Sequence, residues 1–498
     1  MKKIFYTFSI LTISLVLSSC HGKLSNYDVD YPEKFDISKE YNIVFWAKND
    51  SRNDQLDVYK NAISSFETFY PNIHVELKNY TDYNLIYNDV IINIPTKTTP
   101  NVCIAYPDHV ATYMEGSNVV ANLDQLIANE SYGLGGKDVK FSSTKKEEIY
   151  PKFFDEGLIN NKHTVLPFVR SSEALYLNKE YVERLGFTIP DIPTWDWVWQ
   201  VCEKAVEEKK QDQVLYPLIY KSTDNMFITM KKQQGKAFTE NGEVKFLNDD
   251  TKNMLVDLYN KANDGLFSTF KLVSYPANFL NKWQAVMAVD STAGSTWMGY
   301  NASTHDAGSA AEGEPFETVV RPIPQYDINN PKMISQGPSI CVFGKDNPDE
   351  VVASWLFAQF LLTNDVQIGY AKTEGYIPVT TKATNSNEYK SYLANPNENK
   401  VKLAASKLVV DNINNTFITE VYNGSTYARS ASSYLIEAVA VKNSDYNTFD
   451  KMDELFQKAI RFNNLDTSSF SYSAIILLSA LFGVIILLFL LTFVRRKK

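Results

Sequence analysis

The chain has 498 residues, of which 44% are hydrophobic and 21% charged, a composition typical of a folded protein with room for more than one lobe. Its formal net charge is −9. Six of the 49 basic residues lie in the two end segments, which hold no acids, so the rest of the chain carries 43 basic against 58 acidic residues, a net charge of −15. This acidity argues against nucleic acid or an anionic membrane surface as a partner.

The first residues have the pattern of a secretion signal. Two lysines precede an apolar run over 4–17, and Leu-Ser-Ser-Cys then ends at Cys20. Small residues before a cysteine are typical of a bacterial lipoprotein signal, so we predict that residues 1–19 are removed and that Cys20 carries a lipid. An ordinary secretion signal with an incidental cysteine is the alternative.

Strands and helices alternate after a polar linker over 20–38. Residues 42–46 predict a short buried strand, and apolar residues then recur at helical spacing over 56–69. Alternation over 73–77 predicts a second strand. A strand, a helix and a strand in this order indicate a βαβ unit and a parallel sheet. A third strand is expected over 100–105.

The stretch from 166 to 197 has an informative order of elements. Pro167 opens an extended segment, and residues 174–177 form a short apolar strand. The helix that follows is expected to end at Gly186. Thr194 is expected to cap a further helix whose first turn holds Trp195.

The far C-terminus predicts a second membrane anchor. Residues 474–494 contain no charge, a run of about 21 residues that is long enough to cross a bilayer. Residues 495–498 are basic, so the positive-inside rule places this tail in the cytoplasm and the chain from Cys20 to about 471 outside the cell. A buried terminal helix is the alternative. A cell-wall-sorting signal would need a Leu-Pro-x-Thr-Gly motif before the apolar run. The most similar stretch, Leu-Asp-Thr at 465–467, does not match this motif.

The order of elements from 166 to 197 resembles a known family. A Pro-Phe strand, the run Leu-Tyr-Leu-Asn-Lys at 175–179, a helix ending at Gly186 and a Thr-Trp helix start resemble the extracellular solute-binding proteins of family 1, the sugar-receptor subunits of ABC importers. Leu177 stands where that family usually has Tyr, and its members usually carry only the lipid anchor. The resemblance also covers the run at 280–290 and the Gly-Tyr-Ile-Pro turn at 375–378.

The resemblance implies a periplasmic-binding-protein-like α/β fold, with two lobes joined by crossing hinge strands. The crossings are expected near Leu166, Asp290 and Ser335. The implied divisions are a signal peptide at 1–19, a linker at 20–38, lobe one at 39–165 and 285–335, lobe two at 166–284 and 336–465, a transmembrane helix at 474–494 and a basic cytoplasmic tail at 495–498.

No catalytic or metal-binding signature is present. The sequence lacks Gly-x-Ser-x-Gly, a phosphate-binding loop and His-Glu-x-x-His, and its five histidines have no ligand spacing. Cys103, Cys202 and Cys341 are few and far apart, which argues against a disulfide framework and favours small buried hydrophobes. A single bridge is the alternative. We therefore expect no enzymatic activity, no metal and no cofactor.

Candidate ligand-binding residues lie just after the predicted strands and at the crossings. In open α/β sheets, ligands bind beyond the carboxyl ends of the strands. A sugar presents apolar faces that stack on aromatic rings, and hydroxyls that need polar partners. The candidates are Trp46, Tyr106, Asp108, Arg170, Ser172, Trp297, Tyr376 and Tyr427.

Several of these candidates have a structural alternative. Trp46, Tyr106 and Tyr376 would equally serve as packing residues, and Asp108 would serve as a helix cap. Arg170 would pair with a structural carboxylate. Trp297 is the best of the aromatic candidates, because it follows a Gly-Ser loop near an expected hinge.

The resemblance implies a receptor on the outer face of the cell membrane. It would trap a small molecule, expected to be a sugar, by closing its lobes, and would deliver it to ABC permease subunits. A membrane-tethered ligand-sensing or scaffolding ectodomain is the alternative, favoured by the extra C-terminal helix. An enzyme acting on carbohydrate is a third hypothesis.

Overall fold

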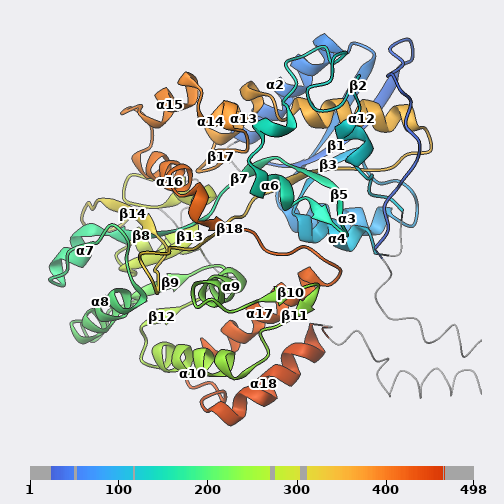
Figure 1. Cartoon of the computed structure of the whole chain (residues 1–498). Coiled ribbons are helices and arrows are strands. Elements are labelled where there is room, and N and C mark those ends of the chain that lie inside the picture. Colours follow the sequence, from blue (N-terminus) through green and yellow to red (C-terminus); the bar gives the residue numbers. More distant parts are fainter. Residues whose placement is uncertain are drawn as a thin grey trace, which may run out of the picture.

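The computed structural model describes residues 24–49, 53–115, 118–269, 275–302, 311–463 and 465. Two five-stranded sheets, each with helices packed against it, form two lobes (Figure 1), which confirms the predicted α/β two-lobe fold. The predicted signal peptide, the predicted lipid site Cys20 and the apolar run at 474–494 with its basic tail lie outside the described residues. None of the helices in the described ranges is long and apolar enough to cross a membrane.

The sheet of lobe one contains the predicted βαβ unit. Its strands, in spatial order, are β2 (Ile73–Tyr80), β1 (Tyr41–Lys48), β3 (Val102–Ala105), β16 (Ser339–Val342) and β6 (Val165–Pro167). β1 and β2 are parallel over their full length, with Tyr41 opposite Ile73, and α2 (Asp54–Phe69) connects them. β16 is antiparallel to both of its neighbours.

The longer helices of lobe one are α2, α3 (Tyr83–Asn93), α4 (Pro107–Tyr113), α12 (Pro348–Phe360) and α13 (Asn364–Ala371). The ring of Phe45 on β1 lies 5.1 Å from Phe357 on α12. α12 is buried on nearly every side. Its outer side is covered by the segment around Tyr132, whose carbonyl accepts a hydrogen bond from the indole nitrogen of Trp355 (2.9 Å).

The sheet of lobe two has the spatial order β12 (Phe267–Ser268), β9 (Leu218–Tyr220), β13 (Met287–Ser291), β8 (Glu173–Asn178) and β14 (Thr318–Pro322). β13 is parallel to β9 and antiparallel to β8. The longer helices of this lobe are α8 (Trp195–Glu207), α9 (Thr223–Gln233), α10 (Asp249–Asn263), α17 (Ser425–Val439) and α18 (Phe449–Phe462).

Local features around β8 agree with the sequence. The predicted strand at 174–177 is β8, and the helix after it, α7 (Lys179–Arg184), is followed by Gly186 with a φ of 84°. Glycine tolerates this left-handed conformation, which ends the helix. The side chain of Thr194 accepts a hydrogen bond from the backbone N–H of Trp197, so Thr194 caps α8 as predicted.

The assignment of the later segments to the two lobes was wrong. β13 and β14, from the segment 285–335 predicted for lobe one, belong to the sheet of lobe two. β16, predicted for lobe two, lies between β3 and β6 in the sheet of lobe one. Asp290 therefore lies inside β13, opposite Ala174, and is not a crossing. A short apolar run predicts a buried strand without indicating which sheet it joins.

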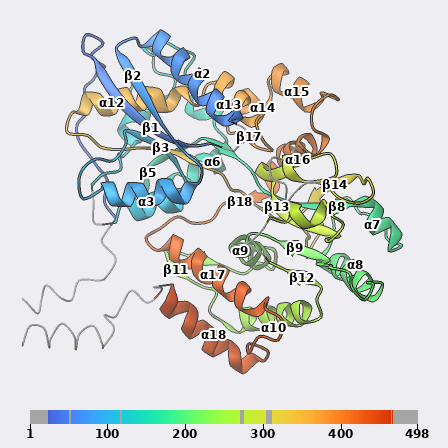
Figure 2. The same cartoon turned by 180° about the vertical axis from the view of Figure 1, so that it is seen from behind.

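The other two predicted crossings are confirmed. Near Leu166 the chain leaves β6, passes through β7 (Val169–Arg170) and enters β8 of the other sheet. Near Ser335 it passes from β15 (Met333–Ile334) to β16. The chain also returns to lobe two after β18 (Thr416–Phe417), which pairs with β15. The helices α14 (Thr381–Thr384), α15 (Asn387–Leu393) and α16 (Lys400–Asp411) group together on the same side of the molecule (Figure 2).

Candidate functional site

Two aspartates occupy matching positions at the edges of the two sheets. In lobe one, β3 leads into α4, which has Asp108 in its first turn. In lobe two, β9 leads into α9, which has Asp224 in its first turn. Backbone dipoles at the start of a helix favour a negative charge. Each lobe thus presents a carboxylate at the carboxyl end of a strand, which is the edge where α/β sheets bind ligands.

Arg429 on α17 lies between these two aspartates. Its Nε is 2.9 Å from Oδ2 of Asp108, and its Nη1 is 3.0 Å from Oδ2 of Asp224. The guanidinium also donates to Oδ1 of Asn225 (3.1 Å) and Oγ1 of Thr419 (3.2 Å). Burial disfavours its charge, but the two carboxylates outweigh burial and raise the pKa of Arg429 above its usual value. We call Asp108, Arg429 and Asp224 the interlobe bridge.

The first turn of α17 touches lobe one at a second place. The hydroxyl of Thr426 donates to the backbone carbonyl of Asp108 (3.1 Å) and lies 3.5 Å from the hydroxyl of Thr112. The start of α17 is therefore held against α4 by one ion pair and by neutral hydrogen bonds.

A polar network next to the interlobe bridge joins lobe two to a crossing segment. Glu173 accepts hydrogen bonds from the hydroxyl of Tyr220 (2.6 Å) and the side-chain amide of Asn225 (3.3 Å). The same amide nitrogen is 2.8 Å from Oε1 of Gln336, whose own amide donates to Oγ of Ser291 (2.9 Å). Burial raises the pKa of Glu173 to about 8, so this acid is mostly protonated at neutral pH.

Two of the predicted ligand residues, Arg170 and Ser172, hold the crossing strands together. Arg170 is 1% exposed and pairs with Glu156, with Nη2 and Oε2 2.7 Å apart. Its Nη1 donates to the carbonyls of Val169 and Pro338 (both 2.9 Å). The buried hydroxyl of Ser172 donates to the carbonyl of Ile334 (2.7 Å). These contacts match the structural alternative that the sequence left open for Arg170.

Three predicted residues, Tyr106, Asp108 and Tyr427, are brought together where α4 meets α17. The half-buried ring of Tyr106 lies 5.5 Å from that of His109, which lies 4.6 Å from Tyr87. Tyr427 lies on the facing turn of α17. Burial raises the pKa of its hydroxyl, and the nearby negative charges of Glu115 and Tyr87 raise it further. Burial raises the pKa of Tyr106 to about 12.

Trp297 and Tyr376 form a second group, beside the crossings. Trp297 is the last residue of η2 (Thr292–Trp297) and is half-buried. The hydroxyl of Thr296, the residue before it, is 2.8 Å from a carboxylate oxygen of Glu374. Tyr376 is buried, its ring 5.5 Å from Tyr370.

Trp46 lies apart from both groups. It is 5% exposed, with its ring 5.4 Å from Tyr80 and the Nζ of Lys78 4.4 Å from the ring centre. The packing alternative for Trp46 fits these contacts.

Comparison with known proteins identifies the family. Residues 61–397 match the family model described as bacterial extracellular solute-binding protein. The chain belongs to this family. The resemblance predicted from the sequence is thereby confirmed, and so is an extracytoplasmic location, which the family implies. A comparison with curated proteins gave no significant match.

Solved structures share the fold of this solute-binding protein at low sequence identity. UgpB from Mycobacterium tuberculosis in complex with glycerophosphocholine is 17% identical, with a TM-score of 0.65, covering 84% of this chain and 98% of its own. An ABC substrate-binding protein from Listeria monocytogenes in complex with cycloalternan is 14% identical, with a TM-score of 0.64 and coverage of 85% and 99%. The sugar-binding protein MalE from Xanthomonas citri is 15% identical, with a TM-score of 0.62 and coverage of 85% and 97%.

Asp224, Glu173 and Arg429 are not among the candidate residues predicted from the sequence. Asp224 had a usable signal, because it follows a short apolar strand at the start of a helix, as Asp108 does. Glu173 is the first residue of the strand whose apolar core was recognised. Arg429 had no local signal, since its partners come from two distant helices.

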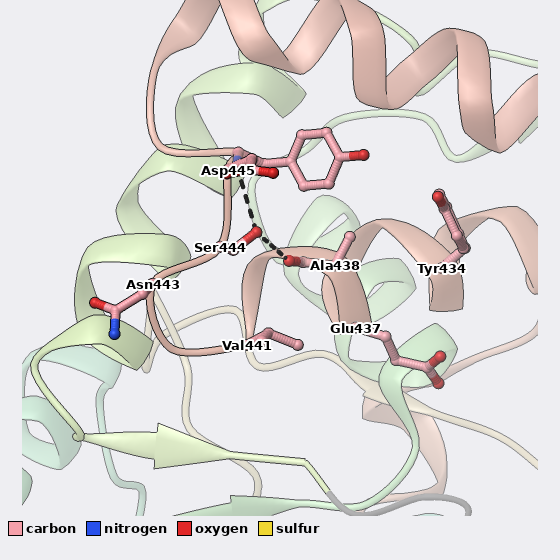
Figure 3. Close-up of a pocket in the computed structure, with 8 residues that line it drawn as sticks. Tyr434, Glu437, Ala438, Val441, Asn443, Ser444 and Asp445 are labelled. Carbon is pink, nitrogen blue, oxygen red and sulfur yellow. Dashed lines mark hydrogen bonds between the residues drawn. The ribbon is translucent and has the colours of Figure 1, made fainter.

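A surface hollow of about 480 Å³ lies on lobe two of this solute-binding protein, away from the predicted residues (Figure 3). The backbone N–H of Tyr446 donates to Oγ of Ser444 (3.3 Å), and that hydroxyl donates to the carbonyl of Ala438 (2.7 Å). The lining residues are Tyr434, Glu437, Ala438, Val441, Asn443, Ser444, Asp445 and Tyr446.

In the part of the chain that the structure describes, no cluster of histidine, cysteine and acidic residues could hold a metal ion. Cys103, Cys202 and Cys341 are buried free thiols, as the sequence predicts. Cys103 and Cys341 are directly opposite each other on β3 and β16, and burial raises the pKa of Cys341.

Proposed function

We propose that this solute-binding protein is the receptor of an ABC importer and that it holds a carbohydrate, or another polyhydroxylated solute, between its lobes. The observation that carries the proposal is the interlobe bridge, in which matching strand–helix edges of the two lobes meet at one arginine. The family supports the receptor role. The structural neighbours, which include a protein in complex with cycloalternan and the sugar-binding protein MalE, support the solute class.

The bound solute would contact both lobes. Asp108 and Tyr106 offer a carboxylate and an aromatic ring from lobe one, and Tyr427 and Asp224 offer the same chemistry from lobe two. Carboxylates accept hydrogen bonds from hydroxyls, and rings stack on the apolar faces of a sugar. A solute that makes contacts on both sides has a higher affinity for the closed than for the open protein, so binding closes the lobes.

Trp297, Tyr376, Arg170, Ser172 and Trp46 remain candidate ligand residues of this proposal. The half-buried ring of Trp297 is the most accessible of them, since the other four side chains are buried. We therefore place the main contacts at Tyr106, Asp108, Tyr427 and Trp297. The protein is proposed to be non-catalytic.

Lipidation at Cys20 and a membrane span over 474–494 would tether the receptor outside the cell at both ends. Labelling with a fatty-acid analogue tests the first anchor, because Cys20→Ala should abolish incorporation while Cys103→Ala retains it. Retention of label by Cys20→Ala would reject lipidation at that position.

A thermal-shift screen of the full-length protein tests the solute class. A solute at about 100 times its Kd adds roughly 2.7 kcal/mol to the free energy of unfolding, a shift of a few degrees in Tm. We expect maltose, maltotriose, cycloalternan or glycerophosphocholine to give this shift. A response to peptides or polyamines alone would reject the proposed solute class.

Substitutions on α17 then test the location of the site. Tyr427→Ala should abolish the shift given by the active solute, and Tyr434→Ala, which alters the surface hollow on the same helix, should preserve it. Equal losses in the two variants would place the solute elsewhere.

The alternative function, a ligand-sensing or scaffolding ectodomain, rests on the predicted C-terminal helix. Purification of the full chain from native membranes separates the two functions. Co-purified permease subunits support import, and a co-purified kinase or adhesin supports the alternative.

A further inference from the structure

The ion pair between Asp108 and Arg429 joins side chains that belong to different lobes. Asp108 begins a helix on the sheet of lobe one, and Arg429 projects from a helix that packs in the core of lobe two. Asp224, the other carboxylate at the guanidinium, lies in lobe two with Arg429. Opening of the lobes therefore breaks the pair with Asp108 and leaves the pair with Asp224 intact.

This arrangement makes the interlobe pair reversible. Arg429 keeps Asp224, Asn225 and Thr419 as partners in the open form, so its charge is never left buried without compensation. The side chains of Asp108 and Arg429 are 14% and 21% exposed, so water reaches both as they separate. A pair at such a partly exposed position is of moderate strength, because hydration competes with it.

When the lobes are in contact, the carboxylate of Asp108 has Arg429 as its ionic partner across the lobes. Its Oδ2 faces the guanidinium, and its Oδ1 is buried and has no hydrogen-bond partner among the described residues. The nearby Thr426 donates to the backbone carbonyl of Asp108 and not to its carboxylate. Removal of the carboxylate charge therefore removes the ionic contact that Asp108 makes with Arg429 across the lobes.

We propose that Asp108 and Arg429 form a latch that holds the lobes of the solute-free protein together and sets the ratio of closed to open molecules. Arg429 supplies the lobe-two side of the latch, and Asp224 is its partner within lobe two. The apparent affinity of a solute that prefers the closed form is its affinity for that form multiplied by the closed fraction, so a larger closed fraction gives a higher apparent affinity. The latch deepens the proposed function, since it rests on lobes that open and close.

Distance measurement by electron spin resonance tests the latch without a solute. Spin labels are attached by a chemistry that does not use cysteine at the exposed positions Lys60 on α2 and Glu207 on α8, in the full-length protein in nanodiscs. Asp108→Asn keeps the shape of the side chain but loses its charge. Asp224→Asn is the matched control, because it removes a carboxylate from the same arginine within one lobe.

We expect Asp108→Asn to lower the ratio of closed to open molecules on the order of tenfold, and Asp224→Asn to change it by less than about twofold. Arg429→Lys, which keeps the charge, should fall between wild type and Arg429→Gln. Unchanged distances in Asp108→Asn, or equal shifts in the two asparagine variants, would overturn the latch.

Addition of maltotriose to the wild-type protein separates this result from the proposed function. The expected difference between the asparagine variants, together with closure of wild type by the sugar, supports both proposals. If the asparagine variants differ as expected and wild type does not close with any sugar, the latch stands and the proposed solute class fails.

Discussion

The hydroxyl of Tyr220 lies 2.6 Å from the buried carboxyl group of Glu173, next to the segment where the chain crosses between lobes. Burial raises the pKa of Glu173 from 4.5 to about 8, although Tyr220 and Asn225 both act to lower it. At pH values between about 4.5 and 8, the folded protein therefore holds a proton on Glu173 that the unfolded chain has released.

The first prediction concerns the pH dependence of stability. Because the folded protein holds this proton and the unfolded chain releases it, the contribution of Glu173 to stability is complete below about pH 4.5 and is lost as the pH rises to about 8. Glu173→Gln imitates the protonated acid and should remove this slope, gaining on the order of a few kcal/mol at pH 9 relative to wild type.

Chemical denaturation at pH 5, 7 and 9 measures this effect. Glu183→Gln, at an exposed position on α7, is the control and should follow the wild-type profile. Parallel profiles for Glu173→Gln and wild type would show that Glu173 is ionised in the folded protein.

The second prediction concerns the buried pair of Arg170 and Glu156, which are 1% and 7% exposed. Arg170→Met leaves a buried carboxylate without its counter-charge, so we expect a loss of about 3–5 kcal/mol in the free energy of unfolding. The double variant Arg170→Met/Glu156→Leu should recover most of this loss, since neither charge is then buried. A double-mutant cycle by urea denaturation measures the coupling, and additive losses would contradict it.

The third prediction concerns Lys231 on α9. Its side chain is buried, and its Nζ has no hydrogen-bond partner in the described part of the chain. Burial lowers the pKa of Lys231, so the unfolded chain binds more protons and the wild type gains stability as the pH rises toward the usual pKa of lysine. Lys231→Met should therefore stabilise the protein by about 1 kcal/mol at pH 7 and by less at pH 10.

Lys232→Met is the matched control for this prediction, because Lys232 is the exposed neighbour on the same helix. It should change the free energy of unfolding by less than about 0.5 kcal/mol. A destabilised Lys231→Met protein would indicate that the amine of Lys231 has a partner.

The fourth prediction concerns the crossing at Gly337, which has a φ of 144°. An added Cβ would lie 2.4 Å from the carbonyl oxygen of Val169, a backbone atom of the other crossing strand. Gly337→Ala should therefore force the two crossing strands apart and cost at least about 2 kcal/mol. Gly294→Ala, where the nearest atom is 4.0 Å away and φ is not positive, should be tolerated. Thermal unfolding of the two variants measures the difference.

Features encoded in neighbouring residues were predictable from the sequence. The βαβ unit, the cap at Thr194 and the helix end at Gly186 each depend on a few adjacent side chains, and all three are confirmed. The lobe assignment of β13 and β16 was not predictable, because both are short apolar strands and only long-range pairing decides which sheet each joins.

The candidate site was partly predictable for the same reason. Tyr106 and Asp108 follow the rule that ligands bind at strand ends, and the structure brings them close to Tyr427 at the start of α17. The role of Arg429 depends on two carboxylates from distant helices, so no local pattern indicates it. For Arg170 the sequence left two roles open, ligand contact and a pair with a structural carboxylate, and its contacts with backbone carbonyls and Glu156 fit the second role.

The position of β16 has a consequence for biosynthesis. Because this strand fills the space between β3 and β6, the first lobe cannot complete its sheet until residues up to Val342 have been made and exported. Until then β3 and β6 each expose an unpaired edge, which is a site for pairing with other chains. A fragment that ends before Ser339 is therefore expected to aggregate.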